Sequence, residues 1–313
     1  MSPIDFTPYH DRLPPFPAAP AQNHGRGEMH FRYEDVTQDG RLGVRPTSHA
    51  IGTAVWRGVL DHHPVATSMI GRGILPILTR LVVCVGGGPI GVRARVTAEG
   101  GFELVEAIDD QGKSRFRADM WADVRGVRSR TFGPPPGPEA EEIALGAMWA
   151  EHVLTKPFAP PAERSVDRLP DGLVTSRTVR ATAPWDAVAL PEGARWLEPE
   201  LRDDAAPFAL GLGHTDSNQH VNSLVFPQLL EEAALRRLHT LGLPFDRFVD
   251  RFEMSFRKPS FAGDVLVLRL RAYERTRADG SVSHGVAGVF ASPDEHTRGL
   301  ERARVFGTLE LTA

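Results

Sequence analysis

A polar run from Gly213 to Asn222 stands directly before an apolar helical stripe and contains the residue types best suited to chemistry. Asp216, Asn218 and His220 alternate along it, so an extended chain would point a carboxylate, an amide and an imidazole to one side. Carboxylates and imidazoles orient and deprotonate water, and free helix amides polarise a carbonyl oxygen. The pattern indicates water attacking an acyl group, a thioester above all. Helix capping alone also accounts for such residues, and this alternative stays open.

The same run resembles a family signature. Asp216-Ser217-Asn218-Gln219-His220-Val221-Asn222, continuing through Phe226 to Glu232, is similar to the Asp-x-Asn-x-His-Val-Asn motif of fatty acyl-ACP thioesterases. A weaker resemblance covers the first half: His30–Val36 resembles the opening strand of those proteins, and Leu78–Val83 the strand after their first helix. The family has a double hotdog fold, in which an antiparallel sheet wraps a central helix twice in one chain. The resemblance therefore implies an α+β fold.

The resemblance also implies roles for individual residues. Asp216 and His220 would handle water and proton transfer, and Asn218 would orient one of them or the carbonyl. The backbone amides near Val221 and Asn222 would receive the oxyanion. The implied activity is hydrolysis of an acyl thioester, on acyl carrier protein or coenzyme A, to the free acid, with no cofactor.

The sequence departs from the family pattern in three respects. Phe226, which we expect near the substrate, stands where the family has a tyrosine, and Asn222-Ser223 stands where the family has two asparagines. Arg257 and Lys258 align with a family glutamate, and Glu253 lies four residues earlier. Hydrolysis then depends on Asp216 alone, or the basic pair stabilises an enolate or contacts a phosphopantetheine phosphate. Dehydration, isomerisation or cyclisation of a carrier-bound chain is therefore an alternative, as is a non-catalytic acyl-binding protein.

The pattern of elements predicts two similar halves. We expect a proline-rich arm over residues 1–27, a hotdog domain over 28–132, a proline-rich linker with a short helix over 133–172, and a second hotdog domain over 173–313. Helices are predicted at Pro46–His63 and Val221–Leu241, and a short one around Glu139–Val153. Predicted strands are Met29–Val36, Ile74–Val85, Ile90–Thr97, Phe102–Ile108 and Phe116–Val127, then Leu173–Ala181, Phe208–Leu212, Arg251–Phe256, Val265–Tyr273, Ser283–Ser292 and Arg304–Leu311.

The apolar lining for an acyl chain is expected from the first half, where the candidates are Trp56, Ile70, Ile74 and Leu75. A net charge of −4 disfavours nucleic-acid binding, and the histidine spacing fits no common metal site. The longest uncharged apolar stretch, Leu81 to Val92, is short for a membrane span, so we expect a cytoplasmic protein. A duplicated chain can supply both paired halves itself, so a monomer or a homodimer is expected.

Overall fold

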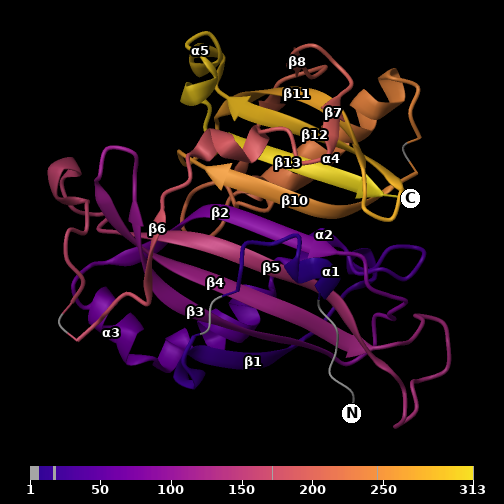
Figure 1. Cartoon of the computed structure of the whole chain (residues 1–313), viewed down its shortest axis with the longest axis horizontal. Helices are drawn as coiled ribbons and strands as arrows, with labels where there is room; N and C mark the ends of the chain where they lie inside the picture. The colour runs from indigo at the N-terminus through magenta and orange to yellow at the C-terminus, as the bar shows by residue number, and fades with distance from the viewer. Residues whose placement is uncertain (1–6, 17–18, 171, 245, 313) are drawn as a thin grey trace. The chain divides into compact units, whose positions relative to one another are not determined.

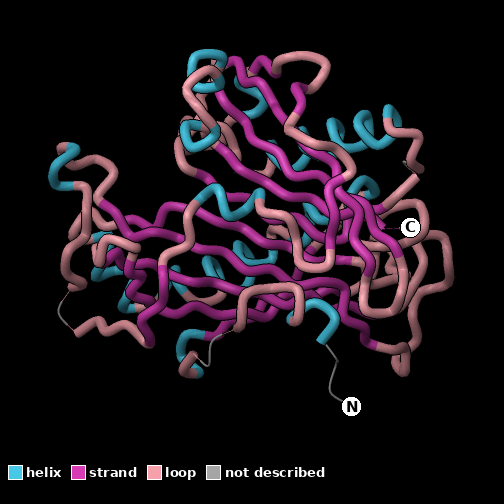
Figure 2. The backbone as a smooth tube through the Cα atoms, turned by 45° about the horizontal axis from the view of Figure 1, so that its top comes forward, coloured by secondary structure: helices cyan, strands magenta, loops and turns pink. Residues whose placement is uncertain are grey.

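The computed structural model describes residues 7–16, 19–170, 172–244 and 246–312. The chain divides into two compact units, one ending at Thr182 and the other spanning Ala183–Ala313 (Figure 1). This division falls ten residues after the predicted end of the linker at residue 172. Strands make up most of the regular structure of both units (Figure 2).

The first unit is built on one antiparallel sheet with the strand order β1-β3-β4-β5-β2. A short sixth strand, β6, adds parallel to β3. The strands are β1 (His24–Met29), β2 (Leu75–Val85), β3 (Val96–Ile108), β4 (Ser114–Val127), β5 (Glu142–Thr155) and β6 (Arg177–Arg180). The predicted strand Phe102–Ile108 is the C-terminal part of β3, which runs through Gly100 and Gly101. The predicted strand Ile90–Thr97 is mostly wrong, because it overlaps β3 only at Val96 and Thr97.

The predicted linker helix and the first predicted strand are both wrong. The segment expected to form a linker helix around Glu139–Val153 is instead β5, which lies between β4 and β2. Because most of β5 is buried on both faces, residues 143–150 carry no polar side chain, and such a run does not separate strand from helix by periodicity. The expected strand Met29–Val36 is also misplaced, since β1 ends at Met29 and Tyr33–Asp35 forms a 3-10 turn.

The helical segment of the first unit is broken, although a continuous helix was predicted over Pro46–His63. It consists of α2 (Val44–Thr47), a π-helical turn (Gly52–Arg57), a 3-10 turn (Leu60–His62) and α3 (Pro64–Ile70). The π-helical turn packs closely on β1, because a Cβ atom on Gly25 would lie 2.3 Å from the Ala54 carbonyl oxygen. The π-helical turn thus contacts the backbone of β1 at a glycine, where no side chain separates the two segments.

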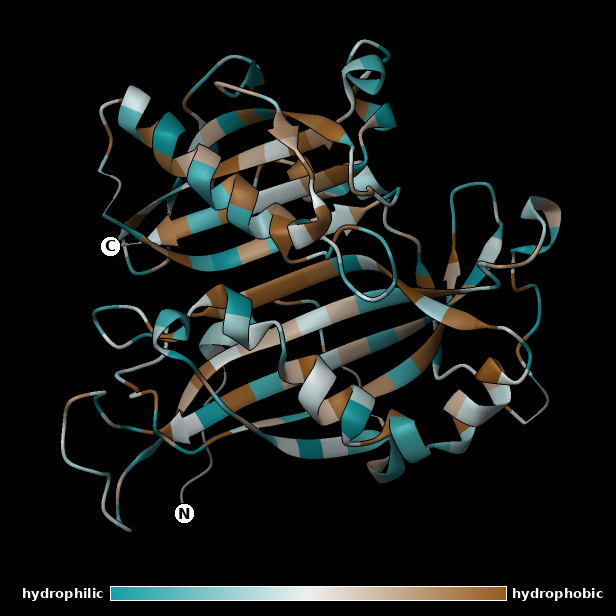
Figure 3. Cartoon of the chain, turned by 180° about the vertical axis from the view of Figure 1, so that it is seen from behind, coloured by the Kyte–Doolittle hydropathy of each residue, from teal (hydrophilic) through white to brown (hydrophobic). Residues whose placement is uncertain are grey.

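The second unit has an antiparallel sheet of order β10-β13-β12-β11, and β7, β8 and β9 each pair with β11. Its elements are β7 (Ala194–Trp196), β8 (Arg202–Asp203), β9 (Phe208–Ala209), α4 (Val225–Thr240), β10 (Phe248–Phe256), β11 (Val265–Thr276), β12 (Val282–Ala291), α5 (Pro293–His296) and β13 (Val305–Thr312). The apolar face of α4, including Leu230, Ala233 and Leu238, is buried against these strands. Apolar and polar bands alternate along the strands (Figure 3). Each unit is therefore a sheet packed on a helical segment, as expected for a hotdog domain.

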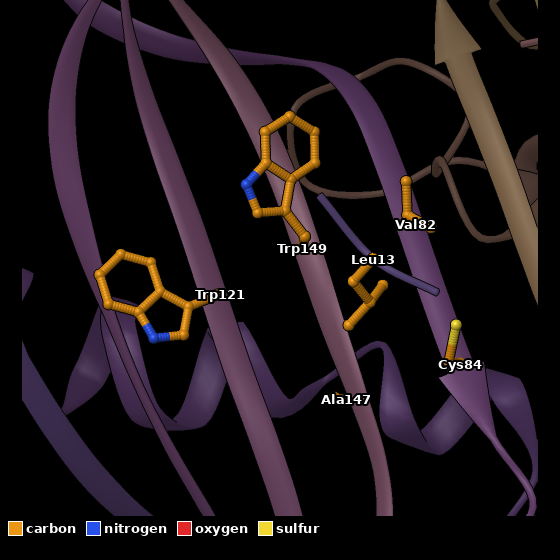
Figure 4. Packing of buried hydrophobic residues seen from close by; sticks show 6 residues of the cluster. All are labelled: Leu13, Val82, Cys84, Trp121, Ala147 and Trp149. Atoms are coloured by element: carbon orange, nitrogen blue, oxygen red, sulfur yellow. The ribbon is translucent and has the colours of Figure 1, made fainter. Parts of the chain in front are cut away.

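The N-terminal arm lies on the face of the first sheet that carries Trp149 and Cys84. α1 (Thr7–His10) opens the described part of the arm and lies in front of β5 in Figure 1. Leu13 is only 8% exposed and packs among Val82, Cys84 and Trp149 (Figure 4). His10 Nε2 lies 2.8 Å from Asp123 Oδ1. The described residues of the arm therefore pack against the first sheet through Leu13.

This packing predicts that Leu13 controls access to Cys84, the single cysteine of the chain. Burial of a leucine side chain contributes about 1.5–3 kcal/mol, so Leu13→Asp should open the arm and speed native-state labelling of Cys84 at least about tenfold. Timed reaction with a thiol reagent measures this rate. Phe132→Asp, at a position 94% exposed, is the matched control and should leave the rate unchanged. Equal rates for Leu13→Asp and the wild type would contradict the packing role.

The other part of the same sheet face carries a buried row of charges. Glu103, Asp119 and Glu151 are cross-strand neighbours on β3, β4 and β5. Arg117 contacts both Asp119, at 2.9 Å, and Glu151, and Arg177 from β6 donates to Glu103 at 2.7 Å. Three carboxylates thus share two guanidinium groups. Burial, with a smaller contribution from the Glu151 charge, raises the pKa of Asp119 to about 6 against the lowering effect of Arg117.

The raised pKa of Asp119 predicts a pH dependence of stability. Because the folded-state pKa lies above the ordinary 3.8, this carboxyl group contributes stability at low pH that is lost as pH rises through about 6. Between pH 5 and 8 the wild type should lose about 1 kcal/mol of unfolding free energy relative to Asp119→Asn. Urea unfolding of both proteins across this range measures the difference, and a pH-independent difference would contradict the assignment.

Candidate active site

The run predicted to be extended is instead a tight turn in front of α4. Thr215 and Val221 form an antiparallel bridge, and Gln219 has a φ of 66°, in the left-handed region. The Asp216 carboxylate accepts a hydrogen bond from the Asn218 backbone N–H at 2.8 Å. An aspartate that bonds its own backbone two residues on favours such a turn over an extended strand. The alternating positions therefore do not project their side chains to one side.

The turn nevertheless brings three of the predicted side chains together. Asp216 Oδ1 lies 4.0 Å from His220 Nδ1, and Asp216 Oδ2 lies 3.5 Å from Asn222 Nδ2. Both Asp216 and His220 are partly exposed, with 27% and 41% of their side chains accessible. Asn222 Oδ1 also accepts the Leu224 N–H at 2.9 Å, so Asn222 caps the turn that leads into α4. A carboxylate, an imidazole and an amide therefore meet at a partly solvated helix start.

Asn218 and the predicted oxyanion amides are placed differently. The Asn218 side chain is exposed, and Asn218 contacts the Asp216 carboxylate through its backbone N–H instead. The Val221 N–H donates to the Ser260 carbonyl at 2.7 Å, and the Asn222 N–H donates to the His214 carbonyl at 2.9 Å. Neither amide is free to receive an oxyanion in this conformation. Within the described residues, the Ser223 N–H at the same helix start donates no hydrogen bond.

Phe226, expected near the substrate, belongs to the core of the second unit. It is 3% exposed, and its ring lies 5.3 Å from that of Phe290 and 6.1 Å from that of Phe256. The ring thus anchors the first turn of α4 to the sheet. Its effect on the site is to fix where the helix begins.

Arg257 and Lys258, which align with the family glutamate, face the segment between β12 and β13. Arg257 donates to the carbonyls of Arg302 and Ala303, and Lys258 Nζ lies 3.0 Å from Glu295. Burial raises the pKa of Glu295, but hydrogen bonds from Arg304 and Lys258 outweigh it and lower the pKa to about 2. Both basic residues therefore have structural partners.

Glu253 cannot replace the missing glutamate, because it lies on the wrong face of β10. Phe256 contacts Phe226 of α4, so Phe252, Met254 and Phe256 point toward the helix. Glu253 points to the opposite face, where it is buried and accepts a hydrogen bond from Arg251 at 2.8 Å.

Ser260, which the sequence pattern did not indicate, adjoins the turn. Its carbonyl receives the Val221 N–H, its side chain is 2% exposed, and its hydroxyl has no hydrogen-bond partner among the described residues. Pro259 was the available signal, because proline disfavours continuation of a central strand and so predicts that the chain leaves the sheet here.

The first unit contains the same turn without the same residues. Tyr33–Asp35 precedes the bridge between Val36 and Leu42 as Leu212–His214 precedes the bridge between Thr215 and Val221. Gly40 has a φ of 87° at the position of Gln219. Asp39 occupies the position of Asn218 and pairs with Arg41 at 2.6 Å. The duplication thus reaches into the motif, but the first copy lacks both the carboxylate at the Asp216 position and the imidazole.

The four residues predicted to line an acyl site border one cavity in the first unit. Trp56, Ile70, Ile74 and Leu75 line a space of about 100 Å³, together with apolar side chains of β3 and β4 such as Phe102 and Met120. All the lining residues are apolar or aromatic. The described residues contain no helix long and apolar enough to cross a membrane, and no group of three or more potential metal-binding side chains.

Solved structures with a similar fold include three thioesterases. One is provisionally named an oleoyl thioesterase, from Lactobacillus plantarum (10% identity, TM-score 0.54, 93% of this chain and 96% of that one). The second is an acyl-ACP thioesterase from Bacteroides thetaiotaomicron (11% identity, TM-score 0.50, 93% of this chain and 98% of that one). The third is a 12:0-ACP thioesterase from Umbellularia californica (13% identity, TM-score 0.51, 92% of this chain and 94% of that one). No family profile and no curated protein matches the sequence. The predicted double hotdog fold, and its likeness to that of acyl-ACP thioesterases, are thereby confirmed; at such identities the likeness shows the fold alone.

Proposed function

We propose that this protein hydrolyses an acyl thioester, carried by acyl carrier protein or coenzyme A, to a free acid and a thiol. The observation that carries the proposal is the meeting of Asp216, His220 and Asn222 at the start of α4. The fold shared with thioesterases adds support, since the same architecture accommodates that chemistry in them.

In the proposed reaction, a water molecule held by Asp216 and His220 attacks the thioester carbonyl carbon. The pair takes up the proton that the water releases, and the new carbon–oxygen bond forms a tetrahedral oxyanion. The Ser223 N–H, at the positive end of α4, is the donor best placed to stabilise that oxyanion. Collapse breaks the carbon–sulfur bond, and the departing thiolate recovers a proton. Asn222 keeps the Asp216 carboxylate oriented and caps the helix start.

The first unit has an apolar cavity of about 100 Å³. Its wholly apolar lining suits a hydrocarbon, which gains stability in proportion to the apolar area removed from water. At the equivalent turn of the first unit, which lacks the carboxylate and the imidazole, the Asp39–Arg41 pair has a structural role.

Product analysis tests the proposal. The protein is incubated with octanoyl-coenzyme A and with octanoyl-acyl carrier protein, and the products are identified by mass spectrometry. Hydrolysis releases octanoic acid and a free thiol. A thioester of altered mass would instead show dehydration, isomerisation or cyclisation, and saturable binding of an unchanged thioester would show an acyl-binding protein. Either of these results would overturn hydrolysis as the function.

A further inference from the structure

A larger cavity of the first unit lies beside its copy of the duplicated turn. The space measures about 380 Å³, and small-molecule sites span about 300–1,000 Å³. Its charged lining residues are two arginines and two acidic residues, namely Arg32, Arg45, Glu34 and Asp35. The charges of the wall therefore balance, which suits a ligand without net charge better than a simple anion or cation.

The four charges are not equivalent, because Arg32 and Glu34 pair with each other. Arg32 Nη1 lies 3.6 Å from Glu34 Oε1, and both side chains are largely exposed. Asp35 ends a 3-10 turn, whereas Arg45 belongs to α2. The Gly43 N–H, just before α2, donates to the Asp35 carbonyl at 3.0 Å and joins the two segments. A carboxylate and a guanidinium thus border one cavity from two linked segments.

His49, which also lines the cavity, is within electrostatic reach of both charges. Partial loss of water around the ring lowers the pKa of His49, the Asp35 carboxylate raises it, and the Arg45 guanidinium lowers it again. The resulting pKa lies below the ordinary 6.5, so the ring is neutral at pH 7 and leaves the charge balance unchanged. A neutral imidazole adds one hydrogen-bond donor and one acceptor to the wall.

The opposed charges are specific to the first copy of the turn. When the bridges of the two copies are aligned, His214 stands at the position of Asp35, and Leu224 stands at that of Arg45. The copy that carries the candidate catalytic groups thus has neither charge. The two copies therefore present different polar groups beside the same turn, as expected if they serve different ligands.

We propose that this cavity binds a small zwitterion with an apolar body, of which α-amino acids with apolar side chains are the simplest examples. The ligand carboxylate pairs with Arg45, because a guanidinium group can bind a carboxylate through two parallel hydrogen bonds. The ligand ammonium group pairs with the Asp35 carboxylate. The apolar body packs on Met29, Phe31 and Pro46, which line the same space.

Calorimetric titration of the full chain at pH 7 tests this inference with L-leucine and two analogues that each lack one charge. 4-Methylpentanoate lacks the amino group of leucine, and 3-methylbutylamine lacks its carboxylate, while both keep the apolar body. L-leucine should bind with a Kd at least about tenfold lower than either analogue, because each analogue leaves one wall charge without its counterpart. L-methionine and L-phenylalanine are titrated in the same way.

Two substitutions assign the contacts. Arg45→Met should raise the Kd for L-leucine about tenfold and leave that for 3-methylbutylamine unchanged. Asp35→Asn keeps an oxygen that can accept the Arg32 N–H, and it should raise the Kd for L-leucine but not that for 4-methylpentanoate. Arg57→Met, at an exposed position outside the cavity lining, is the matched control and should keep wild-type binding.

The wild-type titrations decide the inference even where a variant does not fold. If either analogue binds as tightly as L-leucine, the cavity does not recognise both charges, and the inference is overturned. It is also overturned if none of the three amino acids binds. No thioester enters these titrations, so their outcome is independent of the hydrolysis proposed above.

Discussion

Asp216→Asn should lower kcat for thioester hydrolysis by a factor of about 10²–10⁴, the usual contribution of a positioned general base. The substitution retains a side-chain oxygen that can accept the Asn218 N–H, so the turn before α4 is preserved. It removes the negative charge that faces His220 Nδ1 at 4.0 Å and so weakens proton uptake from water. Single-turnover release of acid from octanoyl-coenzyme A measures the chemical step directly, without product release.

The duplicated turn of the first unit provides a matched control for this experiment. Asp39→Asn changes an aspartate in the equivalent turn, where it pairs with Arg41 and accepts a hydrogen bond from Thr37. It should leave kcat unchanged. A wild-type rate for Asp216→Asn would mean that Asp216 only forms the turn, which is the helix-capping interpretation left open by the sequence.

The candidate site was only partly predictable because its geometry depends on hydrogen bonds between side chains and backbone. The residue types from Asp216 to Asn222 indicate polar chemistry at a helix start, and that location is what the structure shows. The extended conformation was a wrong expectation, since Asp216 bonds the backbone of Asn218 and Gln219 takes a positive φ. Whether a backbone amide is free to bind an oxyanion depends on partners distant in the sequence. The Val221 N–H, for example, is occupied by the Ser260 carbonyl, and a single sequence does not reveal that contact.

The fold, like the site, was predictable from the sequence only in part. Elements with a clear period, such as α4 and the strand β4, were predicted close to their observed bounds. β5 was assigned to a linker helix because a strand buried on both faces has no alternation of apolar and polar residues. The broken helix of the first unit was missed because its π-helical turn packs against the glycine strand β1, a tertiary contact rather than a local preference. The sequence therefore predicts an element correctly where its local pattern and its tertiary packing favour the same conformation.

The largest stability effect is expected at Arg117, which is buried between carboxylates of β4 and β5. Its guanidinium contacts Asp119 through Nε at 2.8 Å and through Nη2 at 2.9 Å, and Nη1 reaches Glu151. Removing one member of a buried ion pair leaves an uncompensated charge, which usually costs about 3–5 kcal/mol. Among the described residues, the basic side chain that would still contact this row is Arg177, which reaches Glu103 and Asp119 but not Glu151.

Arg117→Met should therefore lower the free energy of unfolding by about 3–5 kcal/mol at pH 8. Methionine retains much of the apolar stem, so the loss reports mainly on the charge. At pH 5 the loss should be smaller, because Asp119, whose pKa is raised to about 6, then binds a proton and leaves less negative charge to compensate. Arg180→Met is the control: its pair with Asp110, at 2.9 Å, is exposed, and such pairs contribute about 0–1 kcal/mol. Urea unfolding of the three proteins at both pH values measures these differences. Equal losses for Arg117→Met and Arg180→Met would show that the buried row does not depend on Arg117.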